Sequence, residues 1–420
     1  MFPVLVFALF VLLIDLYAYK GLKVVFDMPS SGLVKTVFRL IYWLVPVILF
    51  LAVIYAVYSR PADPSPPVFN RYYYIVAYTL LFYIPKLVFI AFHLLEDLIL
   101  LFENIAGLFI LYFKTGKFPS GEVNAPRRKF LSRTGIIIAI LPFLGIIYGV
   151  AVGRFDFRVS ETEIRSPGIP ASFDGYRIVH ISDLHIGSFY GYTKRVRQAV
   201  EIINRQQADV IVFTGDLVNN FTAELDGFTG ILGKLTAPDG VYSVLGNHDY
   251  GDYFQWESDA QKKANMKEML AAQENMGWSL LMNEWEPLVR SNDTIVLAGV
   301  ENWGKPPFPR YGDLEKALAG TGGFPFVILL SHDPTHWDAE VLGRSNVDLT
   351  LSGHTHGMQV GIETAMVRWS PSGIRYPRWG GLYIDNGQFL YVNRGLGYVA
   401  FPGRIGMPPE ITVIELKSGI

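Results

Sequence analysis

Metal-ligand residue types follow apolar segments at five places in the second half of this 420-residue chain. These polar groups read Asp183-Leu-His185, Gly215-Asp216, Gly246-Asn-His-Asp249, Ser331-His-Asp333 and Gly353-His-Thr-His-Gly357. Carboxylate, imidazole and amide oxygen ligands suit divalent cations such as Mn, Fe or Zn. Two such ions held close together can activate water and neutralise the charge of a phosphate group. The pattern therefore predicts a metal centre with open positions for water and phosphate.

Apolar, β-branched segments precede each polar group, and they predict the elements that position it. They span residues 176–182, 209–214, 241–245, 326–330 and 347–351. Segments this apolar are typical of strands that are buried on both faces. Polar helical stretches alternate with them at residues 194–206, 259–275 and 313–318. Such alternation predicts a layered α/β domain whose strand ends carry the site.

Single motifs of this kind are usually turns or helix caps, so the prediction depends on their joint order. In an extended segment, side chains two residues apart point the same way, so we expect His354 and His356 to direct both rings to one side. His180 lies inside a predicted strand and His336 at a predicted helix start, and both are interpreted as structural. His93 is interpreted as a residue at a membrane boundary.

The ordered set of motifs resembles the calcineurin-like metallophosphoesterase superfamily over roughly residues 176–416. The stretches Gly246-Asn-His-Asp-Tyr-Gly, Ser352-Gly-His-Thr-His-Gly and Asn393-Arg-Gly-Leu-Gly are similar to a bacterial, membrane-associated branch. The resemblance implies a four-layer αββα sandwich with two divalent metal ions at the strand ends. It implies one ion held by Asp183, His185, Asp216 and His356, and another held by Asp216, Asn247, His332 and His354.

The same resemblance implies that His248 is the catalytic residue beside the leaving-group oxygen, oriented by Asp249. The sequence departs from the family pattern at two positions. Asn219 stands where an Asp is frequent, which weakens a hydrogen bond outside the direct metal ligands. Met358 stands where a Gly is common after the second histidine, which predicts a tighter, more apolar pocket rim.

The first 153 residues contain apolar runs of roughly membrane-spanning length. They occupy residues 3–19, 36–58, 72–92, 94–113 and 135–152 and predict an all-α transmembrane region of about five helices. The third and fourth runs, separated only by His93, could form a tight hairpin or one long helix. Residues 154–175 then predict an entry strand and linker, and residues 176–420 the phosphoesterase domain.

Charged residues within these runs have two interpretations, packing between helices or a functional site inside the membrane. They are Asp15, Lys86, Glu96, Asp97 and Glu103. A transporter or sensor module regulated by the phosphoesterase domain would use them in the second way. A catalytically inactive scaffold is a further alternative, although every expected ligand type is present.

Residues 114–134 are basic, which predicts a cytoplasmic loop and a catalytic domain outside the cytoplasm. The sequence Arg127-Arg-Lys-Phe-Leu131 resembles a twin-arginine export signal, and a plain basic flank of a membrane helix is the alternative. The loop between Lys20 and Arg39 is also basic, yet five spans would place it outside. Four spans with the domain inside therefore stay open. The predicted location is the bacterial inner membrane, as a multi-pass protein.

The predicted substrate is a lipid-linked molecule at the membrane surface, and the bond to be hydrolysed is a phosphate ester or a pyrophosphate bond. A net charge of −2 gives no sign of the excess positive charge that is typical of nucleic-acid-binding proteins. The absence of cysteine excludes thiolate metal ligands. An amphipathic, basic rim is predicted from residues 367–370 and 375–379 together with Trp303, Pro306, Pro307 and Phe308, and ordinary packing with surface arginines is the alternative. The alternative is a UDP-2,3-diacylglucosamine-type pyrophosphohydrolase of lipid A synthesis, whose reaction is cytoplasmic and disagrees with the export topology.

Overall fold

The computed structural model describes residues 2–25, 32–58, 66–115, 125–306, 308–364 and 366–419. The chain divides into two compact units, one of residues 1–61 and 74–148 and one of residues 62–73 and 149–420. The second unit carries the predicted metal ligands, and we call it the catalytic unit. It includes the first turns of a long N-terminal helix, which no sequence pattern indicates.

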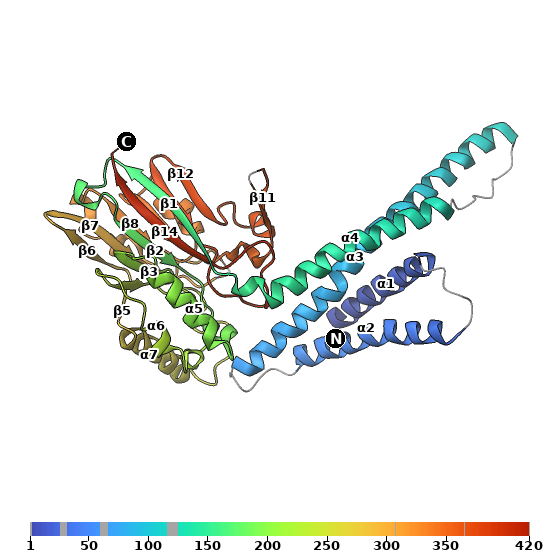
Figure 1. Ribbon diagram of the computed structural model, residues 1–420, viewed down its shortest axis with the longest axis horizontal. Coiled ribbons are helices and arrows are strands. Elements are labelled where there is room, and N and C mark those ends of the chain that lie inside the picture. The colour runs from blue at the N-terminus through green and yellow to red at the C-terminus, as the bar shows by residue number, and fades with distance from the viewer. Residues whose placement is uncertain are drawn as a thin grey trace. The chain divides into compact units, whose positions relative to one another are not determined.

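Four helices, rather than about five, form the N-terminal region. They are α1 (Phe2–Val25), α2 (Leu33–Tyr58), α3 (Pro66–Thr115) and α4 (Ala125–Ala151) (Figure 1). The runs at 72–92 and 94–113 lie in the single helix α3, since His93 is polar but offers no turn chemistry that would end a helix. Three described stretches are long and apolar enough to cross a membrane: Leu33–Ala56, Asn70–Gly107 and Pro126–Phe155.

The charged side chains of this helical unit pair with one another between helices. The Asp15 carboxylate is 1% exposed and bonds Lys86 Nζ at 2.5 Å and the Tyr83 hydroxyl at 3.0 Å. Arg127 of α4 bonds Glu96 and Glu103 of α3, at 3.0 and 2.7 Å. Pairing of this kind is how buried charge is accommodated between helices, which supports the packing interpretation.

The catalytic unit contains two six-stranded mixed sheets (Figure 1). The first has the order β1 (Arg158–Ser166), β14 (Glu410–Ser418), β2 (Arg177–Ile181), β3 (Val210–Phe213), β4 (Val241–Ser243) and β5 (Trp278–Leu280). The second has the order β12 (Gly381–Asp385), β13 (Gln388–Val392), β9 (Leu349–Ser352), β8 (Val327–Leu330), β7 (Asp293–Gly299) and β6 (Glu284–Arg290). A separate two-stranded sheet joins β10 (Ile362–Glu363) to β11 (Arg368–Trp369).

Three hydrophobic cores separate the layers of the catalytic unit. One lies between the sheets and joins Val210 of β3 to Ile328 of β8. Another packs the first sheet against α5 (Thr193–Asn204), α6 (Thr229–Leu232) and α7 (Asp259–Asn275). The third packs the second sheet against α8 (Leu314–Ala317) and a π-helical turn at Trp337–Val341. The predicted α/β layering is thus present, with only short helical segments over the second sheet.

Short 3₁₀ turns complete the catalytic unit and mark several loops of the site. They are η1 (Gly153–Phe155), η2 (Ala171–Phe173), η3 (Ile186–Phe189), η4 (Thr222–Leu225), η5 (Thr321–Gly323), η7 (His356–Gln359) and η8 (Pro371–Ile374).

The five apolar segments predicted as strands form β2, β3, β4, β8 and β9. Within each sheet these strands run parallel, so their carboxyl ends and the motifs that follow meet at one edge. His180 lies inside β2 and bonds the Thr214 hydroxyl at 2.9 Å, and burial lowers its pKa to about 3. His336 precedes the π-helical turn and bonds Ser331 Oγ at 2.8 Å. Both contacts agree with structural roles for these histidines.

Candidate metal centre

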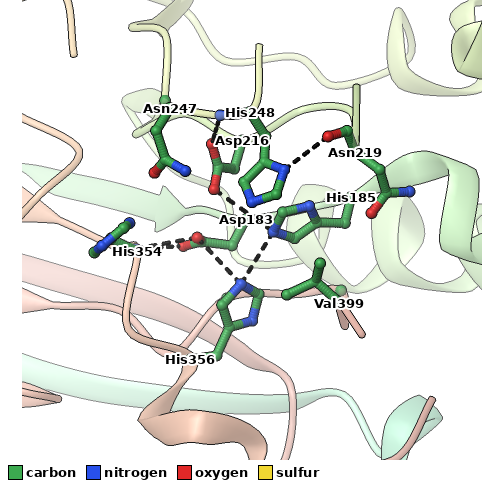
Figure 2. Close-up of polar contacts among 12 residues, drawn as sticks. Asp183, His185, Asp216, Asn219, Asn247, His248, His354, His356 and Val399 are labelled. Atoms are coloured by element: carbon green, nitrogen blue, oxygen red, sulfur yellow. Dashed lines mark hydrogen bonds and ion pairs between the residues drawn. The ribbon is translucent and has the colours of Figure 1, made fainter. Parts of the chain in front are cut away.

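The first group of converging ligand atoms comes from the loops after β2, β3 and β9. His356 Nε2 lies 3.3 Å from Asp183 Oδ1 and 3.1 Å from His185 Nε2 (Figure 2). His185 Nε2 is also 3.6 Å from Asp216 Oδ2. All four side chains are buried. They form the first of the two ligand sets that the family resemblance implies.

The second group lies on the other side of Asp216. His332 Nε2 is 3.2 Å from Asp216 Oδ2, 3.1 Å from Asn247 Oδ1 and 3.3 Å from His354 Nδ1. The oxygen Asp216 Oδ2 therefore faces an imidazole of each group. The structure brings all seven predicted ligand residues together at one edge of the sheets.

The orientation of these side chains fits cations. His332 donates its Nδ1 hydrogen to the Thr214 carbonyl at 2.7 Å, so its Nε2 lone pair faces the acceptors of Asp216 and Asn247. Asn247 donates its amide hydrogen to Tyr253, which turns its carbonyl oxygen to the site. Lone pairs at such distances repel unless a proton or a metal ion lies among them. The donor set suits two ions.

The electrostatics of the centre point the same way. Burial lowers the pKa of the His332 imidazole, but the Asp216 carboxylate outweighs burial and raises this pKa to about 10. Burial raises the pKa of the Asp216 carboxyl, but the imidazoles of His332 and His248 bring it well below its usual range. The negative charge that retains a proton on His332 is the same charge that attracts a divalent cation.

Left-handed backbone, rather than an extended segment, directs the ligands inward. Positive φ values occur at Asp183 (50°), His185 (45°), Asp216 (60°), His354 (71°) and His356 (51°). The prediction of an extended His-x-His segment is therefore wrong. Such conformations are costly for non-glycine residues and concentrate at functional sites.

Two motif glycines allow this close approach of the loops. A Cβ at Gly246 would collide with the Asp216 carboxylate, and one at Gly353 would collide with the Asp183 carboxylate. Each glycine thus leaves room for a ligand carboxylate from a different loop.

His248 has a different partner from the one predicted. The His248 ring donates from Nδ1 to the backbone carbonyl of Asn219 at 2.7 Å. The backbone N–H of His248 donates to Asp216 Oδ1 at 2.9 Å. The predicted contact with Asp249 is absent among the hydrogen bonds of the described residues. The buried Asp249 carboxylate instead accepts the backbone N–H groups of Gly246, Asp216, Leu217 and Val218. Asp249 therefore joins the loop of Asp216 to the loop of Gly246, and the Asn219 carbonyl orients His248.

Two residues outside the motifs hold the Asn219 loop. The buried Glu224 carboxylate accepts the N–H groups of Asn219, Asn220 and Phe221 at 2.7 to 3.0 Å, and the Asn219 side-chain amide at 2.9 Å. The Tyr73 hydroxyl of α3 donates to Asn219 Oδ1 at 3.2 Å. Glu224 thus stabilises the loop in which Asn219 replaces the frequent Asp. The separation of Tyr73 from Asn219 along the chain left no sequence signal for this contact.

Glu224→Gln tests the support of this loop. An amide offers one acceptor oxygen and turns an NH₂ group toward backbone N–H donors, so we expect a loss of about 1–3 kcal/mol in the free energy of unfolding. We also expect kcat to fall, because the carbonyl that orients His248 loses its support, while bound metal stays unchanged. In the full-length variant, thermal unfolding measures the loss of stability, elemental analysis measures the bound metal, and steady-state kinetics measure kcat. Glu257→Gln, at an exposed glutamate, is the matched control.

The amphipathic, basic rim predicted around the site is only partly exposed. Trp303 and Trp379 are each 6% exposed and belong to the interior. Trp369 is 52% exposed, and Phe308 packs edge-on against His354. Pro307 lies outside the described residues. The exposed apolar surface is therefore carried by the segment around Trp369.

Comparisons with known proteins agree with the two-part organisation. Residues 1–154 match a family model described as the transmembrane domain of a probable calcineurin-like phosphoesterase, and residues 176–358 match the calcineurin-like phosphoesterase model. The Bacillus subtilis metallophosphoesterase YkuE is 33% identical over 302 residues, covering 70% of this chain and 98% of that protein. A Danio rerio transmembrane protein with metallophosphoesterase domain is 30% identical over 293 residues, covering 68% of this chain.

The match to the Danio rerio protein spans 63% of that relative's length, so less than two thirds of it. YkuE, in contrast, is matched over almost its whole length. The buried Asp and His clusters, the matched family models and these relatives lead to one assignment. The chain belongs to the calcineurin-like metallophosphoesterases, metal-dependent hydrolases, with a transmembrane domain preceding the catalytic domain.

Proposed function

We propose that this protein is a membrane-anchored, binuclear-metal phosphoesterase that hydrolyses phosphate ester or pyrophosphate bonds of a lipid-linked substrate at the membrane surface. The proposal includes the αββα layering and the domain limits 1–153, 154–175 and 176–420. Asp183, His185, Asp216 and His356 hold one ion, of Mn, Fe or Zn, and Asp216, Asn247, His332 and His354 hold the other. His248 is the catalytic residue, and Asp249 supports it indirectly.

When bound, two divalent ions lower the pKa of a water molecule and neutralise phosphate charge during in-line attack. The chain's residues supply the remaining chemistry. The Thr214 carbonyl fixes the His332 tautomer, so that Nε2 faces the site. With its Nδ1 hydrogen bonded to the Asn219 carbonyl, the imidazolium of His248 can donate its Nε2 proton to the departing oxygen. The same carbonyl stabilises the positive charge of the ring before transfer.

The contact between Tyr73 and Asn219 carries the lipid part of the proposal. Tyr73 lies within the candidate span Asn70–Gly107, three residues from its start. Its hydroxyl bonds the Asn219 side chain, and the Asn219 carbonyl bonds His248. Nearby, Asn70 Nδ2 donates to the Gly187 carbonyl in the loop after His185, at 3.2 Å. The catalytic histidine is thus two hydrogen bonds from the first turn of a membrane span. A phosphate in a lipid head group lies at that level.

Hydrolysis by the full-length protein in detergent tests this function. The substrates are p-nitrophenyl phosphate, bis-p-nitrophenyl phosphate and a short-chain lipid phosphate. We expect a chelator to abolish activity and Mn, Fe or Zn to restore it, with the lipid phosphate preferred by kcat/KM. No hydrolysis by the folded, metal-loaded protein would contradict the enzyme. Hydrolysis without preference for the lipid would contradict the substrate class alone. A pyrophosphate-linked lipid, assayed beside these esters, tests the UDP-2,3-diacylglucosamine-type alternative.

The helix count also supports the predicted orientation of this multi-pass protein. Two candidate spans, Leu33–Ala56 in α2 and Asn70–Gly107 in α3, separate the start of α2 from the start of α4. After these two crossings the chain is back on the side of the membrane from which α2 started. The basic segments 20–39 and 114–134 therefore lie on the same side of the membrane, in contrast to a five-span arrangement. The positive-inside rule places that side in the cytoplasm. The catalytic unit then lies outside the cytoplasm, beyond the third span.

Because the chain has no cysteine, single cysteines can report this orientation. We expect Ala260→Cys, on the exposed start of α7, to react with a membrane-impermeant maleimide in spheroplasts. Ser120→Cys, between the sequences of α3 and α4, should react only after the membrane is permeabilised. The reverse labelling pattern would place the catalytic unit in the cytoplasm and favour the lipid A alternative.

A further inference from the structure

An exposed apolar surface surrounds the two-stranded sheet β10–β11, which Figure 1 shows at the edge of the catalytic unit. We call Ile362, Met366, Val367 and Trp369 the apolar hairpin, and they are 54, 97, 50 and 52% exposed. After residue 149, the described chain exposes thirteen large hydrophobic side chains, and six of these lie between residues 358 and 374. Clusters of this kind mark a protein or membrane interaction surface rather than ordinary scatter.

The base of the apolar hairpin is bonded to the end of a membrane-spanning helix. Gly361 donates its N–H to the Ile405 carbonyl at 2.9 Å, immediately before β10. The next residue back, Arg404, donates its N–H to the Gly149 carbonyl at 3.1 Å. Gly149 lies within the candidate span Pro126–Phe155 and belongs to the catalytic unit. The hairpin therefore starts close to the carboxyl end of this candidate span.

The side chains of this surface have the chemistry of a membrane interface. Trp369 and the neighbouring Arg368 combine an amphipathic ring with a cation, a pairing enriched at the level of lipid head groups. The side chains of Met366 and Val367 add an apolar tip and carry no charged group. The Arg368 guanidinium bonds the Glu363 carboxylate at 3.2 Å, and this ion pair holds the positive charge of Arg368 at the base of the hairpin.

The surface also continues to the metal centre through three consecutive residues. Ile374 is 90% exposed, Arg375 is exposed, and Tyr376 is buried with its hydroxyl 2.9 Å from His354 Nε2. The Arg375 guanidinium lies over the Phe308 ring, 5.1 Å from its centroid. A lipid whose acyl chains contact Ile374 would therefore have a cation between its apolar part and the proposed ligand His354.

We propose that the apolar hairpin inserts into the head-group region of the lipid bilayer and presents membrane lipids to the metal centre. The partner is the bilayer, because the base of the hairpin is tied to a span. Bilayer contact does not depend on which phosphate bond is cleaved, whereas lipid presentation rests on the proposed function. Two experiments separate these parts.

The first experiment measures insertion without activity. Met366→Cys is labelled with an environment-sensitive fluorophore in the full-length protein, reconstituted at one chain per phosphatidylglycerol–phosphatidylethanolamine nanodisc. We expect a blue-shifted emission that spin-labelled lipids quench and aqueous iodide does not. Val289→Cys, on the 60% exposed Val289 of β6, is the control and should show the reverse. Equal iodide quenching at both positions would overturn the proposal. A blue shift that needs two chains per disc would assign the surface to a second copy and overturn it as well.

The second experiment measures lipid presentation. Met366→Asp places a charge on the hairpin and removes no buried contact, because Met366 is 97% exposed. Val289→Asp is its matched control. We expect Met366→Asp to raise KM for a lipid phosphate in vesicles about tenfold and to leave p-nitrophenyl phosphate hydrolysis unchanged. An unchanged KM with vesicles would overturn lipid presentation. If no ester is hydrolysed by the parent protein, the proposed function fails, and the fluorescence experiment still decides insertion.

Discussion

Asp216→Asn is expected to reduce phosphoesterase activity at least about 1,000-fold, because both proposed ions lose a ligand. Asp216 Oδ2 lies 3.6 Å from His185 Nε2 and 3.2 Å from His332 Nε2, so it is the oxygen that the two ligand groups share. The charge stabilisation by metal ions is worth several kcal/mol, and each 1.36 kcal/mol corresponds to a tenfold change in rate. Kinetics and elemental analysis of the same full-length sample measure activity and bound metal together.

The variant also removes a contact that organises the site, since Asp216 Oδ1 accepts the His248 N–H at 2.9 Å. Asparagine can keep that contact through its carbonyl oxygen, which separates loss of the metal from loss of the loop. Asp226→Asn is the matched control and should keep full activity. Asp226 is an exposed aspartate that, like Asp216, follows β3 in the sequence. Retention of both metals and of activity by Asp216→Asn would contradict the shared-ligand role.

His248→Ala is expected to lose most turnover, by about 100- to 10,000-fold, while both metals stay bound. The expectation follows from the position of the ring, whose Nδ1 is held by the Asn219 carbonyl and whose Nε2 is left for the leaving group. A leaving group that needs no proton should escape most of the loss. The rate should therefore fall far more for an alkyl phosphate than for p-nitrophenyl phosphate.

The comparison of leaving groups separates this role from a metal ligand, since loss of a metal would slow both esters equally. His248 also lies close to His185, with ring centroids 4.8 Å apart, so the metal content of the variant must be measured. His336→Gln, at a histidine assigned to packing, is the control for removal of an imidazole. Loss of metal from His248→Ala would contradict the proton-donor role.

The sequence by itself determined the kind of centre and the elements that carry it. Apolar segments at 176–182 and 209–214 form β2 and β3, as predicted, and the proposed ligands Asp183 and Asp216 follow their ends. These features are local, because strand propensity, burial and turn chemistry depend on neighbouring residues. The order of the motifs then indicated the family, and the apolar runs indicated a membrane region.

Only the tertiary structure decided how these parts meet. It replaced Asp249 by the Asn219 carbonyl as the partner of His248, and it brought Tyr73 to Asn219 across 146 positions of the chain. It also joined two apolar runs into α3 and put left-handed backbone at His354 and His356. A hydrogen bond between distant segments requires a match of geometry that no single segment encodes. For that reason residue types and order were readable from the sequence, whereas partners and directions depended on the fold.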